Sequence, residues 1–284
     1  MNMEAILPQV YSVGSLLILF VVVFTVAKLA NELLTPYNID DQLTDHDNFA
    51  LSVSLSGYFL AVVIIFVGAM IGPSKGLMKD LLYVGGYSLL GIVLLNVSRI
   101  INDKVILRKF CNVKEIIEDK NAGVGAVQMG SYVASALMIA GAISGQGGGF
   151  LTATAFFFLG QVALLIMAGI YNFIISYDLH EELEKDNVSA GIGFAGTLVA
   201  IGVILLSSLS GNFISWAENL TEFAIDGAIA FIVLPIFRLF FDKVIIPKSD
   251  LNHEIKNDQN CGAGLLEFVI TVGFSVILLM VLRG

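Results

Sequence analysis

The chain has 284 residues, of which 57% are hydrophobic and only 14% are charged. Ordinary soluble domains carry about 25% charged residues, so this composition, with a mean hydropathy of +0.86, is typical of an integral membrane protein. The formal net charge of −9 argues against nucleic acid as a partner.

Eight apolar runs have roughly the 20 residues that a helix needs to cross a hydrocarbon core. In chain order, the predicted spans are 10–33, 49–72, 80–104, 122–145, 150–174, 188–210, 223–246 and 262–282. Uninterrupted apolar runs indicate helices, because the strands of a membrane barrel alternate instead. The first run is too long for a cleavable signal peptide, and no basic residue precedes it. The sequence therefore predicts an all-α protein with eight transmembrane helices in a lipid bilayer.

The two halves of the chain repeat each other. The segment "RIINDKVILRKF" at 99–110 returns as "RLFFDKVIIPKS" at 238–249, and a shift of 139 aligns the halves without a gap from about residue 47. Between Arg99 and Gly125, 12 of 27 positions match under this shift. We therefore expect two four-helix repeats, 1–145 and 146–284. An even number of helices in each repeat makes the two copies parallel in the membrane.

Each repeat is itself a pair of similar hairpins. Every second span opens with acidic residues, an Asn and then small residues, in "DHDNFALS", "EDKNAGVG", "EKDNVSAG" and "NDQNCGAG". The four asparagines are Asn48, Asn121, Asn187 and Asn260, and a glycine follows nine places after each of the first three. Val269 takes that place in the fourth copy, so we expect its packing to differ.

This motif, in pairs of hairpins, resembles the bacterial inner-membrane family catalogued as domain of unknown function 350. The chain looks like two such domains in tandem, and the resemblance covers nearly its whole length. It implies a helical, membrane-embedded fold. It supplies no catalytic residue, since the family has no assigned activity.

Basic residues set the predicted orientation. Three of the 15 lie on one side, namely Lys75, Lys79 and Arg283. The other 12 lie in or beside the connections after the odd-numbered spans, namely Lys28, Arg99, Lys104, Arg108, Lys109, Lys114, Lys120, Lys185, Arg238, Lys243, Lys248 and Lys256. Because basic residues concentrate on the cytoplasmic side, we expect a multi-pass protein of the bacterial inner membrane with both termini outside the cytoplasm.

The four Asn motifs have two interpretations. Asn is a favoured N-cap, an acidic neighbour suits the positive end of a helix, and small residues let helices approach closely. The motifs then serve structure alone. Alternatively, four capped helix ends that converge on one face could line an ion or solute vestibule near the cytoplasmic ends of the even-numbered helices.

A few ionisable groups fall within the spans, where they are costly and often functional. Glu267 lies six residues into the eighth span, about 9 Å deep at 1.5 Å per residue. Arg238 has a similar depth and can meet Asp242 one turn on or reach across to Glu267. The counterparts in the first repeat are Arg99, Asp103 and the neutral Gln128. These residues form either a structural ion pair or a proton- or cation-responsive site centred on Glu267.

Other signals are weak. His46, His180 and His253 stand among acidic residues, but no ligand spacing organises them. We therefore predict no metal, no cofactor and no enzymatic activity. The G-x-x-x-G steps at Gly141, Gly145 and Gly149 permit close contacts and a homo-oligomer without requiring one.

Two functions remain open from the sequence. The first is an ion or small-solute channel or transporter. The second is a membrane scaffold that recruits a soluble cytoplasmic partner, with "DLHEELEKDN" at 178–187 as a short charged docking helix.

Overall fold

A computed structural model describes residues 3–109, 111–245, 247 and 249–283. Lys248 and the last residue of the predicted span 223–246 lie outside these residues. Eight helices in the described part are long and apolar enough to cross a membrane, which confirms the predicted fold class. They are α1 (Met3–Leu34), α3 (Phe49–Met70), α4 (Leu77–Ile101), α6 (Ala122–Ile143), α7 (Phe150–Ile174), α9 (Val188–Leu209), α10 (Trp216–Ile245) and α12 (Cys261–Arg283).

Two helices begin seven residues earlier than the apolar runs predict. The helix α10 begins at Trp216 rather than at 223, and α1 begins at Met3 rather than at 10. Hydropathy marks only the stretch that prefers lipid, whereas backbone hydrogen bonding continues through polar residues such as Glu218 and Glu222.

A short helix precedes each Asn motif. These helices are α2 (Ile39–Thr44), α5 (Asn112–Ile117), α8 (Leu179–Glu184) and α11 (Leu251–Lys256), and the sequence led us to expect only the third. The residue before each Asn has positive φ, at 46°, 53°, 60° and 47° for Asp47, Lys120, Asp186 and Gln259. All four hairpins thus share one uncommon left-handed turn. We call the end of the molecule that carries α2, α5, α8 and α11 the short-helix end. A π-helical turn, η1 (Asn102–Ile106), continues α4 there.

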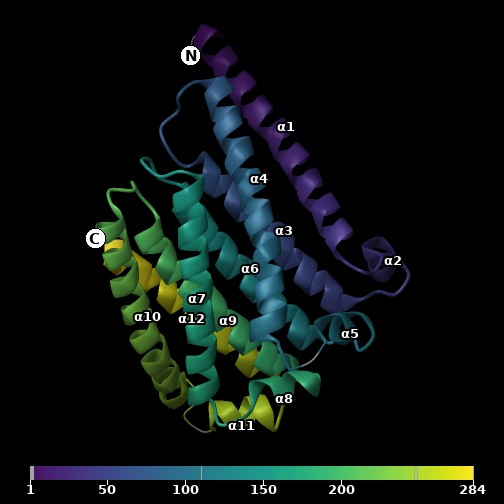
Figure 1. Ribbon diagram of the computed structural model, residues 1–284. Coiled ribbons are helices and arrows are strands. Elements are labelled where there is room, and N and C mark those ends of the chain that lie inside the picture. Colours follow the sequence, from purple (N-terminus) through teal and green to yellow (C-terminus); the bar gives the residue numbers. More distant parts are fainter. Residues whose placement is uncertain (1–2, 110, 246, 248, 284) are drawn as a thin grey trace.

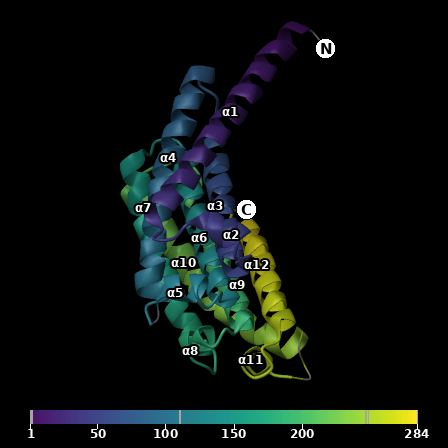
Figure 2. The same cartoon turned by 90° about the vertical axis from the view of Figure 1, so that its right-hand side faces the viewer.

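The long helices form two layers. The helices α3, α6, α9 and α12, which follow the Asn motifs, pack side by side in that order, and α1, α4, α7 and α10 form a second row against them. In Figure 2, α4 and α7 of the second row lie on the left, while α3 and α12 of the first row lie to their right. Both termini lie at the end opposite the short helices, and α1 slants away from the rest (Figure 1).

The row of α3, α6, α9 and α12 is built by one repeated contact. A Cβ on the glycine nine residues after each Asn would meet the backbone Cα of the next helix at 2.5–2.7 Å, for Gly57 on Met129, Gly130 on Ala195 and Gly196 on Phe268. The fourth copy has no next helix, and Val269 in that place is 55% exposed. The expectation that its packing differs is confirmed. The row of helices ends at the copy that lacks this glycine.

A second glycine faces the previous helix in the row. It lies four residues after the Asn, and its Cβ would meet a backbone carbonyl oxygen at 2.3–2.5 Å, for Gly125 on Ala50, Gly191 on Gly123 and Gly264 on Ser189. The first copy has no previous helix and carries Ser52 at this place. Small residues thus allow the close approach of helices that packing in a bilayer favours.

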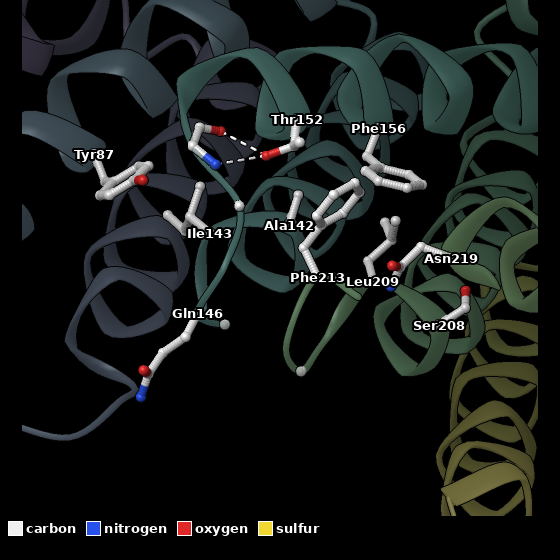
Figure 3. A pocket seen from close by; sticks show the side chains of 14 residues that line it. Tyr87, Ala142, Ile143, Gln146, Thr152, Phe156, Ser208, Leu209, Phe213 and Asn219 are labelled. Atoms are coloured by element: carbon white, nitrogen blue, oxygen red, sulfur yellow. Dashed lines mark hydrogen bonds between the residues drawn. The ribbon is translucent and has the colours of Figure 1, made fainter. Parts of the chain in front are cut away.

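The two repeats also meet at the end opposite the short helices. A Cβ on Gly145 would lie 1.5 Å from the carbonyl oxygen of Gly211, and Gln146 O accepts the Phe213 N–H at 2.7 Å. Of the predicted glycine contacts, Gly141 makes one, since a Cβ there would lie 2.9 Å from Leu209. Gly149 makes none, because a Cβ there would meet nothing within 4 Å. Figure 3 shows the cavity of about 30 Å³ that remains here, too small for more than a water molecule or two.

Candidate functional site

The first three motif asparagines are fully buried and tie each hairpin to the next. The side-chain oxygens of Asn48, Asn121 and Asn187 each accept the backbone N–H three residues on, which caps the helix. Their Nδ2 groups donate to the carbonyl oxygens of Ile116, Leu183 and Ile255 at 2.8, 2.5 and 2.8 Å, and these belong to or adjoin the short helices of the following hairpins. Asn260 has no following hairpin and is exposed.

The Nδ2 groups of all four motif asparagines also donate to a polar side chain five or six residues earlier. The acceptors are Gln42, Glu115, Glu182 and Glu254 at 2.9–3.2 Å. The motif therefore works as a cap, a clamp and a link between hairpins. The helix ends stand in a row and not in a ring, and three of the four asparagines have no exposed surface. The structural interpretation of the motif accounts for these contacts.

Two equivalent carboxylates show how the end of the row differs from its middle. Glu115 and Glu254 occupy matching places in the two repeats. Burial raises the pKa of the Glu115 carboxyl, whereas the hydrogen bond from Asn260 lowers the pKa of the Glu254 carboxyl. The difference arises because Glu115 is buried, whereas Glu254, in the last hairpin, is not.

This arrangement predicts unequal effects for two identical substitutions. Asn121→Ala should lower the free energy of unfolding by about 2 kcal/mol, because it removes an N-cap and a buried hydrogen bond to Leu183. Asn260→Ala, the matched control, should lose the cap and the bond to Glu254 but no link to a following hairpin, so its loss should be smaller. Equilibrium unfolding of the purified proteins in mixed micelles measures both. Equal losses would show that the link to the next hairpin adds nothing.

The predicted charged residues of the second repeat meet in a closed cluster. Arg238 Nε lies 2.6 Å from Glu267 Oε1, and both side chains are nearly inaccessible to solvent. The Tyr171 hydroxyl donates to the same oxygen at 3.2 Å, and its ring lies under the guanidinium, 5.4 Å from the centroid. A space of only about 10 Å³ lies beside Tyr171 and Arg238. Of the two partners that depth allows for Arg238, the structure selects Glu267.

Asp242 has a different role. Its Oδ1 accepts the backbone N–H of Leu251 at 2.7 Å, so it holds the start of α11 against α10. Its Oδ2 lies 3.2 Å from the exposed ammonium of Lys243.

The matching residues of the first repeat line an open cavity of about 210 Å³ just inside the short-helix end. Arg99 donates to Asn31 Oδ1 at 2.9 Å and to the Leu34 carbonyl oxygen at 2.7 Å. Asp103 Oδ1 accepts the amide groups of Asn112 at 2.7 Å and Gln128 at 3.3 Å. We call this space the first-repeat cavity.

The two clusters differ at two matching positions whose side chains are in contact. The Ser54 hydroxyl donates to Gln128 Oε1 at 2.6 Å in the first repeat. In the second repeat Gly193 replaces the serine, and a Cβ there would lie 2.6 Å from Glu267 Oε2. The charged side chain and the missing Cβ therefore occur together, while the neutral side chain occurs with a hydrogen-bonding serine.

The sequence does not reveal several lining residues. Asn31 and Tyr171 belong to the first helix of their repeats. In each repeat this helix precedes the residues that align without a gap. Tyr37, Tyr58 and Tyr132 also line the first-repeat cavity. Burial raises the pKa of the Tyr37 hydroxyl, so this group stays a neutral hydrogen-bonding partner. Polar residues of ordinary type in apolar helices give no signal by themselves.

The histidines lie apart from these clusters. His180 Nε2 contacts the Ile106 carbonyl oxygen at 2.7 Å, and His253 lies 3.6 Å from Asp258. In the described part of the chain, no three His, Cys, Asp or Glu side chains are grouped so that they could hold a metal ion.

Comparison with known proteins adds a family. The family model described as Domain of Unknown Function (DUF350) matches residues 5–143 and again residues 147–282. A UPF0719 transmembrane protein from Aquifex aeolicus (strain VF5) is 26% identical over 261 residues, covering 89% of this chain and 93% of that protein. The UPF0719 transmembrane protein YshE from Bacillus subtilis (strain 168) is 24% identical over 123 residues, covering 43% of this chain and 87% of that protein. No solved structure matches.

Proposed function

Because this chain belongs to the DUF350 family, with two copies of the domain in one polypeptide, we propose that it is an inner-membrane carrier whose first repeat moves a small polar solute. The second repeat braces the first. This proposal takes the protein to be a transporter and not an enzyme.

The observation that carries the proposal is a pair of hollows at opposite ends of the first repeat. The first-repeat cavity lies at the short-helix end. A second hollow of about 410 Å³ lies at the other end, between Ser12 and Leu16 of α1, Asp80 and Tyr83 of α4, and the loop around Gly145. Carriers that alternate between two faces need such a pair of openings with a barrier between them.

The barrier is apolar and borders a loosely held helix. Buried Val23 of α1, together with Ala61, Val62, Ile65 and Phe66 of α3, forms part of one hydrophobic cluster in this repeat. The helix α1 is the least buried of the eight, and it contributes residues to both hollows. A tilt of α1 would therefore change access at both ends. The second repeat has a closed ion pair where the first has a cavity, which suits a supporting role.

The excess of basic side chains at the short-helix end supports a cytoplasmic position for that end. Both termini then lie outside the cytoplasm. The bacterial relatives support the inner membrane as the location.

A scaffold has weaker support. The helix α8, the proposed docking segment, is one of four equivalent short helices, and its apolar side chains Leu179 and Leu183 are buried within the protein. Only charged side chains such as Glu181 and Glu184 remain on its surface.

The proposal predicts that a bulky side chain at the mouth of the first-repeat cavity stops transport. Val113 lines the cavity and is 41% exposed, so Val113→Trp should fill the opening without disturbing the core. Val105, which is 45% exposed on η1 and does not line the cavity, gives the matched control Val105→Trp. The measurement is the reswelling of proteoliposomes in osmotic gradients of small polyols, amines and carboxylates, followed by light scattering.

We expect at least one solute class to enter faster than in empty liposomes, with Val113→Trp returning the rate to that of empty liposomes and Val105→Trp leaving it unchanged. No entry of any solute, together with a partner protein that is lost when 178–187 is altered, would replace the carrier by the scaffold.

A further inference from the structure

The two repeats give an internal comparison of one site in two states. At corresponding places the second repeat has Arg238 and Glu267, and the first repeat has Arg99 and Gln128. The arginine is kept, but its carboxylate is missing from the first repeat. The space next to the arginine grows from about 10 Å³ to about 210 Å³.

Arg99 has only neutral partners. Its Nη1 and Nη2 groups donate to an amide oxygen of Asn31 and a backbone oxygen of Leu34. No carboxylate oxygen of the described residues lies within 4.0 Å of its guanidinium, in contrast to the 2.6 Å pair in the second repeat. A guanidinium carries five N–H donors and binds carboxylates through two parallel hydrogen bonds. Arg99 therefore has donors to spare inside a cavity.

Asp103 lines the same cavity but forms no close ion pair with Arg99. The amide groups of Asn112 and Gln128 already donate to its Oδ1. These bonds tie the carboxylate to α5 and α6, and it forms no ion pair with Arg99 within 4.0 Å. An anionic solute therefore meets an arginine whose hydrogen-bond partners are all neutral.

Resting on the carrier proposal, we propose that the solute of the first-repeat cavity is a small monocarboxylate, whose carboxylate binds Arg99 as Glu267 binds Arg238. The remaining lining suits such a molecule. Tyr37 and Tyr132 offer hydroxyl groups, while Leu55 and Ile116 provide an apolar wall for a short hydrocarbon tail. The cavity volume of about 210 Å³ equals that of several water molecules, which limits the solute to a small molecule.

The test is to place a carboxylate of the protein itself next to Arg99, where the solute carboxylate is proposed to bind. The double substitution Ser54→Gly/Gln128→Glu gives the first repeat the same two residues that the second repeat has at the matching positions, Gly193 and Glu267. Wild-type protein in detergent is titrated calorimetrically with acetate, propionate and butyrate, and separately with chloride, phosphate and butylamine. We expect saturable binding of the carboxylates to wild type only. The double variant should fold and bind none of them, because the carboxylate introduced by the second substitution pairs with Arg99.

Arg99→Gln should also abolish binding, and the double variant keeps the test decisive if that single variant does not fold. Binding of butylamine in preference to carboxylates, equal binding of chloride and phosphate, or undiminished carboxylate binding by the double variant would each overturn the inference. The carrier proposal stands if another solute class enters proteoliposomes and Val113→Trp blocks it. It fails separately if carboxylates bind but no solute crosses.

Discussion

Replacing Glu267 with alanine should lower the free energy of unfolding by about 3–5 kcal/mol, the range for removing one partner of a buried ion pair. The loss is large because Arg238 would keep its charge in a nearly dry site within a membrane-crossing helix, with Asn252 Oδ1, 3.1 Å away, as a neutral acceptor. Equilibrium unfolding in mixed micelles gives the free energy directly.

Two further variants separate the cost of a lone charge from the worth of the pair. Glu254→Ala removes a half-buried carboxylate at the same end of the molecule and should cost far less. Arg238→Met/Glu267→Met removes both charges and should recover much of the loss, since a well-packed apolar pair often replaces a buried ion pair without penalty. If the double variant is as unstable as Glu267→Ala, burial of an unpaired charge is not the cause. Transport per folded molecule should survive in the double variant, because the sealed cluster serves as a brace.

Gly191→Ala should be the most damaging single-methyl change in the row of α3, α6, α9 and α12. The added Cβ would lie 2.3 Å from the carbonyl oxygen of Gly123 and 2.6 Å from its Cα, and a backbone neighbour cannot move aside as a side chain can. We expect a loss of about 3 kcal/mol, the upper part of the range for overpacked cores.

Gly273→Ala is the matched control, since it also lies within a transmembrane helix and its Cβ would meet nothing within 4 Å. It should leave stability unchanged or raise it by up to about 1 kcal/mol, the helix preference of alanine over glycine. Equal stability of the two variants would mean that α6 and α9 can separate at little cost. The same unfolding measurement decides between these results.

Much of the architecture follows from the sequence because it depends on local properties. Helix length and apolarity decide which segments cross a bilayer, and those segments agree with the eight long helices to within a few residues at most ends. The repeated Asn motif marks the start of α3, α6, α9 and α12, since capping is a matter of three or four neighbouring residues. The resemblance to domain of unknown function 350 rests on these same residues, and the family match bears it out.

Two residues in the sequence mark the ends of the row of α3, α6, α9 and α12, but this can be recognised only from the packed structure. Ser52 breaks the glycine pattern facing a previous helix, and Val269 breaks the pattern facing a next one. Position in the chain alone does not say that these mark free edges. The packed helices do, because a Cβ is excluded only where another backbone comes close.

What the sequence determined by itself is the set of eight membrane-crossing helices, their duplication in two repeats and the kinship of Arg99 with Arg238, because each depends on the order of residues along the chain. Only the tertiary structure decided that Arg238 pairs with Glu267 and that Arg99 faces a cavity. Those outcomes depend on Asn31, Tyr171 and other side chains brought in from separate helices. Hydropathy fixes how deep a residue lies in the bilayer, but it leaves open the direction in which the side chain points and what stands opposite.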